Sequence, residues 1–125
     1  FSGCKNITSI PAGLFKNNKN VTSFRYCFSD CENITSIPAG LFDNNENVTN
    51  FSSCFEDCQN ITSIPADLFK NNKNVTSFYA CFNNCSSITS AVPRLWETHP
   101  NATHGLCFKG CTNAANYADI PDDWK

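Results

Sequence analysis

The sequence predicts an α/β solenoid, in which coils with short strands and single helical turns stack along one axis. The first observation behind this prediction is a repeat of 27 residues that fills most of the 125-residue chain. The second is that each repeat contains two half-repeats with the same opening pattern, and the third is an alternation of charge between successive repeats. Near-identical segments of this length stack as coils that contact only their neighbours, so we do not expect a closed globule.

The repeat changes little from copy to copy. The first and third full copies differ at only six of their 27 positions. A fourth copy is degenerate and has Trp96 where the full copies have phenylalanine. We therefore predict a single repeat domain over residues 1–125, made of a partial repeat 1–5, full repeats 6–32, 33–59 and 60–86, a degenerate repeat 87–112 and a C-terminal cap 113–125.

The two ends of the chain differ from the full copies. Residues 1–4 align with residues 28–31, the end of a full repeat. We therefore expect further repeats upstream in the parent protein, or a neighbouring subunit stacked on this end. The tail contains two aromatic residues, Tyr117 and Trp124, which we expect to cover the last coil.

Each full copy divides into half-repeats of 14 and 13 residues. In the first copy, residues 7–10 and 21–24 open the two halves, and their β-branched side chains predict short strands or extended legs. Cys27, Phe28 and Cys31 have the i, i+1, i+4 spacing that predicts one helical turn with its side chains in the core. A proline follows the first strand, and the asparagine-rich run after it is predicted to be a loop.

Charged residues at equivalent positions alternate in sign. If successive coils lie about 5 Å apart, like charges in one column would repel each other and alternating charges would attract. Each exposed pair contributes only about 0–1 kcal/mol, so we expect the columns to specify register more than stability. The three columns are Lys16, Asp43, Lys70; Lys19, Glu46, Lys73; and Lys5, Glu32, Gln59.

The pattern Val-Thr-Ser-Phe-x-x-Cys-Phe-x-x-Cys-x-Asn-Ile-Thr-Ser-Ile-Pro-x-x-Leu-Phe resembles the BspA-like leucine-rich-repeat surface proteins, and related repeats of gut bacteria and their phages. The stretch from Leu95-Trp96 through 107–113 to Trp124 resembles the closing segment of such arrays. The resemblance covers essentially the whole chain. It implies a right-handed leucine-rich-repeat solenoid that serves adhesion or host-surface recognition. The 27-residue coil and the extra cysteine column depart from the family's commoner repeats, which leaves the curvature and the binding face open.

Composition excludes several classes of function. Charged residues make up 16% of the chain, the net charge is −2, and the nine basic residues are scattered singly. This is not the footprint of a nucleic-acid-binding protein. No apolar run approaches the roughly 18 residues that a membrane span needs, so we expect no membrane insertion.

No catalytic constellation is visible in the sequence. The only histidines, His99 and His104, lie in the degenerate repeat without a repeated serine or aspartate partner, and the five glycines form no phosphate-binding loop. We therefore predict that the protein is not an enzyme and needs no cofactor.

The nine cysteines fall into two columns and leave two readings open. Each Cys-Phe-x-x-Cys unit could close a disulfide in an oxidising compartment, or its thiols could remain buried as small apolar side chains. A metal site is disfavoured, because Cys-x₃-Cys spacing with only two histidines does not match zinc motifs. The disulfide candidates are Cys27 with Cys31, Cys54 with Cys58, Cys81 with Cys85, and Cys107 with Cys111.

Nine Asn-x-Ser/Thr motifs also allow two interpretations. In a eukaryotic secreted protein they would accept N-linked glycans. Alternatively, each asparagine opens its half-repeat with a bond from its side chain to the backbone, and the repetition favours this second interpretation. The candidates are Asn6, Asn20, Asn33, Asn47, Asn50, Asn60, Asn74, Asn84 and Asn101.

Partner-binding candidates come from positions where near-identical copies differ. Two such positions follow the second strand of each copy, and we expect them to form adjacent outward columns. Arginine and tyrosine dominate binding hot spots, although neutral drift at exposed sites would give the same variation. The candidates are Arg25, Tyr26, Ser52, Ser53, Tyr79 and Ala80.

The sequence thus predicts a non-catalytic leucine-rich-repeat segment of a secreted or surface-displayed protein, which binds a protein or glycan partner. The alternative is a structural repeat whose copies stack end to end in an extracellular filament or virion-associated fibre, coated with N-linked glycans. The regular threonine columns also suggest an ice-binding face, but neighbouring asparagine and charged columns interrupt the flat plane that such a face requires.

Overall fold

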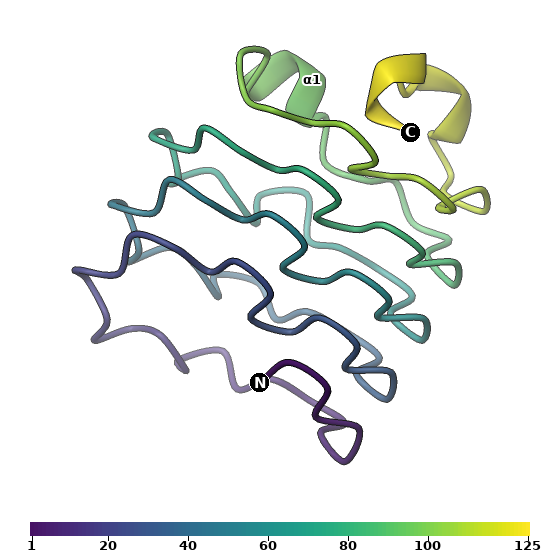
Figure 1. Cartoon of the computed structure of the whole chain (residues 1–125). Helices are drawn as coiled ribbons and strands as arrows, with labels where there is room; N and C mark the ends of the chain where they lie inside the picture. Colours follow the sequence, from purple (N-terminus) through teal and green to yellow (C-terminus); the bar gives the residue numbers. More distant parts are fainter.

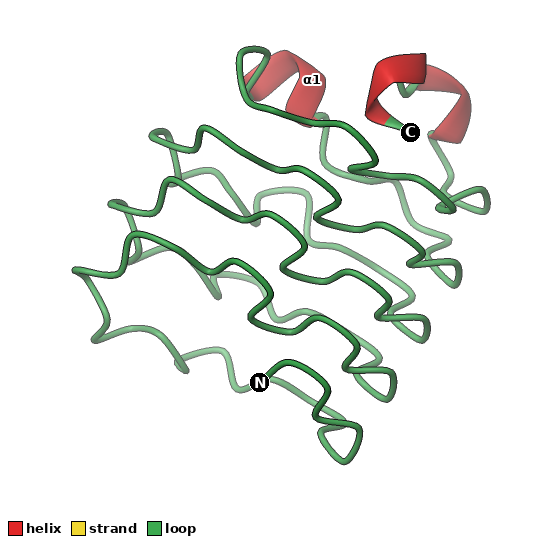
Figure 2. Cartoon of the chain, viewed as in Figure 1, coloured by secondary structure: helices red, strands yellow, loops and turns green.

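The computed structural model describes all residues 1–125, and its backbone winds through successive coils that stack on one another (Figure 1). The N-terminus lies at one end of this coil stack, and the C-terminus lies at the other end beside α1. Regular elements are few, and Figure 2 shows most of the chain as loops and turns. The helices are α1 (Leu95–Thr98), η1 (Tyr117–Asp119) and η2 (Asp122–Trp124), and the strand pairing is limited to the parallel bridges Ser23–Asn50, Asn50–Ser77 and Ser77–Thr103.

The predicted helical turn at Cys27–Cys31 is wrong. This segment is a run of β-turns, because Tyr26 and Asp30 adopt positive φ values of 58° and 59°, which a right-handed helix does not allow. The amide of Cys27 bonds to the carbonyl oxygen of Phe24 at 3.1 Å, and such i to i−3 bonds recur along the run. The strand predicted at residues 7–10 is absent as well.

The remaining amides of this run bond to the next coil. The amide nitrogen of Phe24 lies 2.9 Å from the carbonyl oxygen of Asn50, and that of Phe28 lies 2.8 Å from the carbonyl oxygen of Cys54. The pattern repeats in the following coils, for example between Phe55 and Cys81 at 2.9 Å. We call residues 24–31 and their equivalents the turn run. Along it, backbone amides donate alternately to a carbonyl of the same coil and to a carbonyl of the next coil.

Columns of phenylalanine fill the space between the two sides of each coil. The longest runs through Phe28, Phe55, Phe82 and Phe108, whose stacked ring centroids lie 5.4, 5.4 and 5.8 Å apart. These four side chains are at most 1% exposed. Each aromatic contact adds about 0.5–1.5 kcal/mol to the burial of the rings, so the column binds neighbouring coils together.

A buried column of asparagines lies on the opposite side of the core from the turn run. Asn45 and Asn72 are fully buried, and each Nδ2 donates to two backbone carbonyls of the preceding coil. For Asn72 the acceptors are the oxygens of Phe42 at 3.2 Å and Asn45 at 3.0 Å. In the fourth coil His99 takes this position, with Nε2 2.8 Å from the oxygen of Asn72. The sequence predicted only a loop here.

The tail lies over the fourth coil. The amide of Phe108 donates to the carbonyl oxygen of Trp124 at 2.8 Å, and the Trp124 side chain is 3% exposed. The Trp124 ring stacks on His104 with the centroids 4.2 Å apart, and Tyr117 is half-buried. None of the helices has the length and apolar character that a membrane crossing requires.

Replacing Asn72 by alanine should lower the free energy of unfolding by about 2 kcal/mol, because it removes two buried hydrogen bonds to the oxygens of Phe42 and Asn45, each of which then keeps only its backbone donor. Urea unfolding followed by circular dichroism measures this loss. The matched control is Asn71→Ala, which removes one bond from a less buried side chain to Asp43 and should cost about 1 kcal/mol. Equal losses in the two variants would contradict the structural role of the buried column.

Candidate recognition surface

Two exposed tyrosines mark the outer surface of the turn runs. Tyr26 and Tyr79 are each 44% exposed, and the only other large apolar side chain exposed to this extent is Phe1. We call the surface formed by Arg25, Tyr26, Tyr79 and Gly105 the tyrosine face. Its residues come from equivalent segments of three coils, so the coil stack fixes their order.

Arg25 and Tyr26 form a pair on this face. The guanidinium carbon of Arg25 lies 4.9 Å from the centroid of the Tyr26 ring, and one guanidinium nitrogen donates to the tyrosine hydroxyl at 3.5 Å. The backbone amide of Arg25 bonds to the hydroxyl of Ser23 at 3.2 Å. The cation–π contact holds two side chains of the hot-spot types together at an exposed position.

Tyr79 lies close to the fourth coil. A Cβ atom built on Gly105 would be 3.4 Å from Cε2 of Tyr79, so the glycine lets the ring approach the backbone. The Tyr79 amide bonds to the Ser77 hydroxyl at 3.2 Å, and this hydroxyl lies 2.7 Å from that of Ser52. The tyrosine nevertheless keeps 44% of its surface open to solvent.

The predicted outward columns are wrong at Ser52, Ser53 and Ala80. Their exposed fractions are 8%, 3% and 1%, and all three are therefore buried. The amide of Tyr26 bonds to the oxygen of Ser52 at 3.1 Å, and the amide of Ser53 bonds to the oxygen of Tyr79 at 2.8 Å. The small side chains thus lie between coils that carry larger ones, and only Arg25, Tyr26 and Tyr79 of the six candidates are exposed.

All nine cysteines are free thiols in the structure, which is the second of the two readings of the sequence. The thiols of one column donate to backbone oxygens of the preceding coil, as Cys58 does to Phe28 at 3.0 Å and Cys85 to Phe55 at 3.1 Å. The thiols of this column thus face the preceding coil, and none of the candidate disulfides within the Cys-Phe-x-x-Cys units is formed in the structure. No group of cysteine, histidine or acidic side chains has the arrangement of a metal site.

Burial controls the acidity of these thiols. Removal from water disfavours the thiolate and raises the pKa of Cys27 to about 11 and the pKa values of Cys58 and Cys111 to about 12. Neighbouring thiols in the column add to the increase at Cys58. Such thiols are weak nucleophiles at neutral pH.

Four of the nine predicted glycan acceptors bond to the backbone of the preceding coil. The Nδ2 atoms of Asn47, Asn60 and Asn74 donate to carbonyl oxygens at 3.0, 2.7 and 3.2 Å, and Asn33 bonds to Lys5 in the same way. These contacts support the backbone-bonding interpretation at these positions. Glycosylation itself stays a prediction, and Asn6, Asn20 and Asn101 are exposed candidates without a side-chain hydrogen bond.

Asn50 and Asn84 make bonds of other kinds, the first within its own coil and the second to a side chain of the preceding coil. The Asn50 Oδ1 accepts the amide of Ser52 at 2.8 Å, and the Asn84 Nδ2 donates to the carboxylate of Asp57 at 2.9 Å. Asn84 adopts a φ of 62°, a conformation that asparagine tolerates better than most residues. Their side chains therefore shape the turn run rather than bridge the coils through backbone carbonyls.

The charge columns pair in part. Lys5 lies 3.4 Å from Glu32, and Lys70 lies 3.7 Å from Asp43. Both pairs are largely exposed, so each contributes about 0–1 kcal/mol. The remaining predicted pairs, which involve Lys16, Lys19, Glu46 and Lys73, do not come within ion-pair distance.

Both histidines are engaged in structural contacts. His99 accepts or donates at 2.8 Å to the Thr98 hydroxyl through Nδ1, while its Nε2 continues the buried asparagine column. His104 lies with Nδ1 2.7 Å from the oxygen of Ala102 and Nε2 2.8 Å from the carboxylate of Asp123. Each ring thus fixes the fourth coil or its cap through both nitrogens.

No protein-family model matches this chain, and no curated protein matches it. Among solved structures, the chain is similar to the crystal structure of a TLR13–ssRNA13 complex, with 12% sequence identity and a TM-score of 0.18. The match covers 86% of this chain and 27% of that one. Because a TM-score this low carries no argument, the right-handed leucine-rich-repeat fold and the BspA-like resemblance stay predictions.

The unfolding free energy should fall as the pH rises above about 9. Burial raises the folded-state pKa of Cys58 and Cys111 from 9.0 to about 12, so their contribution is complete below pH 9 and is lost as pH rises toward 12. Each such thiol should cost about 1.4 kcal/mol per pH unit in this window. Urea unfolding at pH 8, 9.5 and 10.5 in reducing buffer measures the slope, which should be shallower in Cys58→Ala; an unchanged slope would contradict this account.

Proposed function

We propose that the chain is a non-catalytic recognition module of an extracellular or cell-surface protein, in which a leucine-rich-repeat-type solenoid binds a protein or glycan partner. The observation that supports this proposal is the tyrosine face. On a chain whose surface is mainly asparagine, serine and threonine, two half-exposed tyrosines and an arginine gather on equivalent segments of the coils.

The chemistry of this face suits a partner with both apolar and polar surface. The open part of the Tyr79 ring offers an apolar platform, and its hydroxyl can donate and accept hydrogen bonds. Arg25 adds donors for carboxylate or hydroxyl groups. Because coil-to-coil bonds hold the backbone at Tyr26 and Tyr79, little backbone conformational entropy is lost on binding.

Binding to a printed glycan array and to a panel of immobilised extracellular-matrix proteins tests the proposal. For a partner found in this way, Tyr79→Ala and Tyr26→Ala should each weaken binding at least about tenfold, because hot-spot aromatics contribute on that scale. Tyr79→Phe should retain most of the affinity, since the ring platform stays. Lys16→Ala, an exposed change outside the face, is the control. A partner that binds all four variants equally would refute this face as the binding surface.

A second candidate function is a structural repeat that stacks end to end in an extracellular filament or fibre. It is favoured by the phenylalanine and cysteine columns, which run through the full coils without interruption. A further copy of the repeat would continue these contacts.

Light scattering on a purified chain distinguishes the two functions. The recognition module should keep a mass near 13.8 kDa as the concentration rises from about 10 µM to about 1 mM. A mass that grows with concentration, together with no partner on either panel, would favour the filament instead.

A further inference from the structure

His104 stands in a column that otherwise holds phenylalanine. Its carbonyl oxygen accepts the amide of Cys107, as the oxygens of the equivalent phenylalanines accept the amides of the equivalent cysteines. Those phenylalanines are Phe24, Phe51 and Phe78, and all are buried. The His104 side chain is 25% exposed, and its ring stacks on Trp124 at an interplanar angle of 7°. Any aromatic ring could pack in this way, so the packing alone does not require the two nitrogens of a histidine.

Both ring nitrogens of His104 face atoms that can only accept a hydrogen bond. Nδ1 lies 2.7 Å from the carbonyl oxygen of Ala102, and Nε2 lies 2.8 Å from Oδ2 of Asp123. A neutral imidazole carries one N–H group, whereas the imidazolium carries two. The imidazolium therefore donates to both oxygens, and a neutral ring must turn a lone pair toward one of them.

His99, the other histidine, does not need a second proton. Its Nε2 lies 2.8 Å from the carbonyl oxygen of Asn72, so this nitrogen donates. Its Nδ1 lies 2.8 Å from the hydroxyl of Thr98, which can donate to a bare ring nitrogen. The neutral ring thus satisfies both contacts of His99, and the requirement for an imidazolium is specific to His104.

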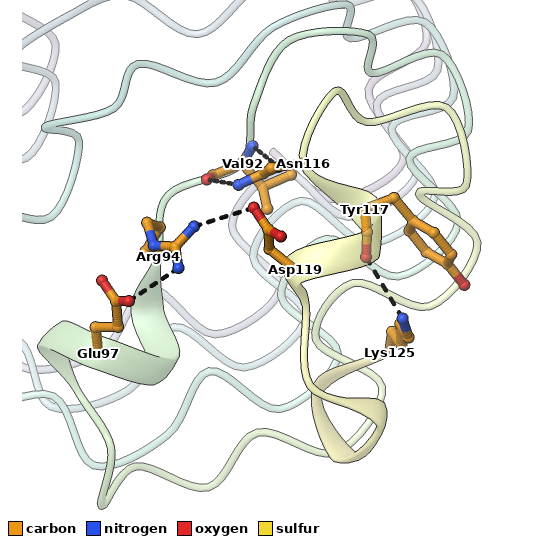
Figure 3. A network of polar contacts seen from close by, with 7 residues as sticks. All are labelled: Val92, Arg94, Glu97, Asn116, Tyr117, Asp119 and Lys125. Carbon is orange, nitrogen blue, oxygen red and sulfur yellow. Dashed lines mark hydrogen bonds and ion pairs between the residues drawn. The ribbon is translucent and has the colours of Figure 1, made fainter.

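The first part of the tail, around η1, is held without a histidine. The side-chain amide of Asn116 exchanges two hydrogen bonds of 2.8 and 3.1 Å with the backbone of Val92 (Figure 3). The guanidinium of Arg94 lies 3.4 Å from the carboxylate of Asp119 (Figure 3). Neither contact depends on the protonation of an imidazole, so this part of the tail is a fixed attachment.

The second part of the tail, η2, is joined to the fourth coil by His104 and by one backbone bond. The amide of Phe108 donates to the carbonyl oxygen of Trp124 at 2.8 Å. In the preceding coils the equivalent amides, those of Phe28, Phe55 and Phe82, donate to the next coil. Trp124 therefore takes the place of a further coil, and release of η2 would uncover the donor with which each coil binds its successor.

Few charged groups face the ring of this latch residue. η2 presents Asp123 directly, and its neighbouring carboxylate, Asp122, lies 3.7 Å from the ammonium group of Lys125. The third coil brings the phenol of Tyr79 beside the adjacent glycine. In the fourth coil, burial raises the pKa of the Cys107 thiol well above its usual range, so this thiol stays neutral at moderate pH. Asp123 is thus the charged partner that the ring contacts.

We propose that His104 is a pH-sensitive latch, which holds η2 against the fourth coil when its ring is protonated. Imidazole is the side chain whose charge ordinarily changes between pH 5 and 8. On the acidic side of this range, the imidazolium bonds to Ala102 and Asp123 together, and η2 stays in place. On the alkaline side one of the two bonds is lost, η2 is released more often, and the amide of Phe108 becomes accessible.

Amide exchange measured by NMR at pH 5.5 and pH 8 tests the latch, with each rate divided by the intrinsic rate at the same pH. The protection of the Phe108 amide should fall about tenfold at the higher pH, the effect of one hydrogen bond to a charged group. The amides of Phe82 and Ala115 are internal controls, because they bond to Cys107 and Ser90 and not to η2. An unchanged Phe108 amide, or an equal fall at all three amides, would contradict the latch.

Variants separate the latch from the packing of the ring. His104→Phe restores the residue of the full copies and keeps a ring against Trp124, so protection of the Phe108 amide should no longer depend on pH. Asp123→Asn offers Oδ1 to the protonated ring and Nδ2 to the neutral ring, so it should also remove the dependence. His99→Asn, which restores the buried asparagine column, is the matched control and should retain the tenfold difference. If the difference persisted in His104→Phe, another group would be its cause and the proposal would be wrong.

Discussion

The hydrogen bonds between alternate amides of one turn run and the carbonyls of the next are the constraint on which the rest of the structure depends. They tie Phe24 to Asn50 and Phe28 to Cys54, a fixed offset of 26 residues along the chain. Once this offset is set, every side chain lies above its equivalent in the previous coil. The phenylalanine rings must then stack, and each buried thiol must face a carbonyl rather than its nearest cysteine in sequence. The lack of regular strands therefore leaves few backbone groups without a partner, because the amides and carbonyls of the turn runs form hydrogen bonds with one another.

The same constraint separates the residues that hold the coils together from those that are free to change. Positions in the buried columns repeat almost unaltered, whereas the first and third copies differ at exposed positions such as Arg25 and Tyr79. A new side chain at such a position projects from a backbone whose place in the coil stack is fixed by hydrogen bonds. The exposed side chains can thus vary without disturbing the stack, provided that the small residues Ser52 and Ser53 remain between the larger ones.

The period of the repeat was enough to predict stacked coils and inward-facing phenylalanines, because these follow from spacing alone, whereas the predicted charge columns pair only at Lys5–Glu32 and Lys70–Asp43. The helical turn at Cys27 was predicted wrongly. Tyr26 adopts a positive φ there, and because it is not a glycine the sequence gives no sign of this conformation. The buried role of Asn45 and Asn72 was hidden for a related reason. An Asn-Asn pair beside charged residues has the composition of a surface loop, and only the fold shows that one member of each pair turns inward.

The fourth coil shows how a small loss of repetition creates a groove. Glu97, the residue of α1 at the position equivalent to Lys70, forms an ion pair with Arg94 instead of with Lys70. His99 replaces asparagine in the buried column. The first change leaves Lys70 with Asp43 of the preceding coil as its one ion-pair partner, while the second keeps the backbone bonded, since His99 still donates to the oxygen of Asn72. The stack therefore remains continuous at the very place where its surface pattern ends. A groove of about 580 Å³ between the third full coil and α1 is the result, at the place where the repeat is broken.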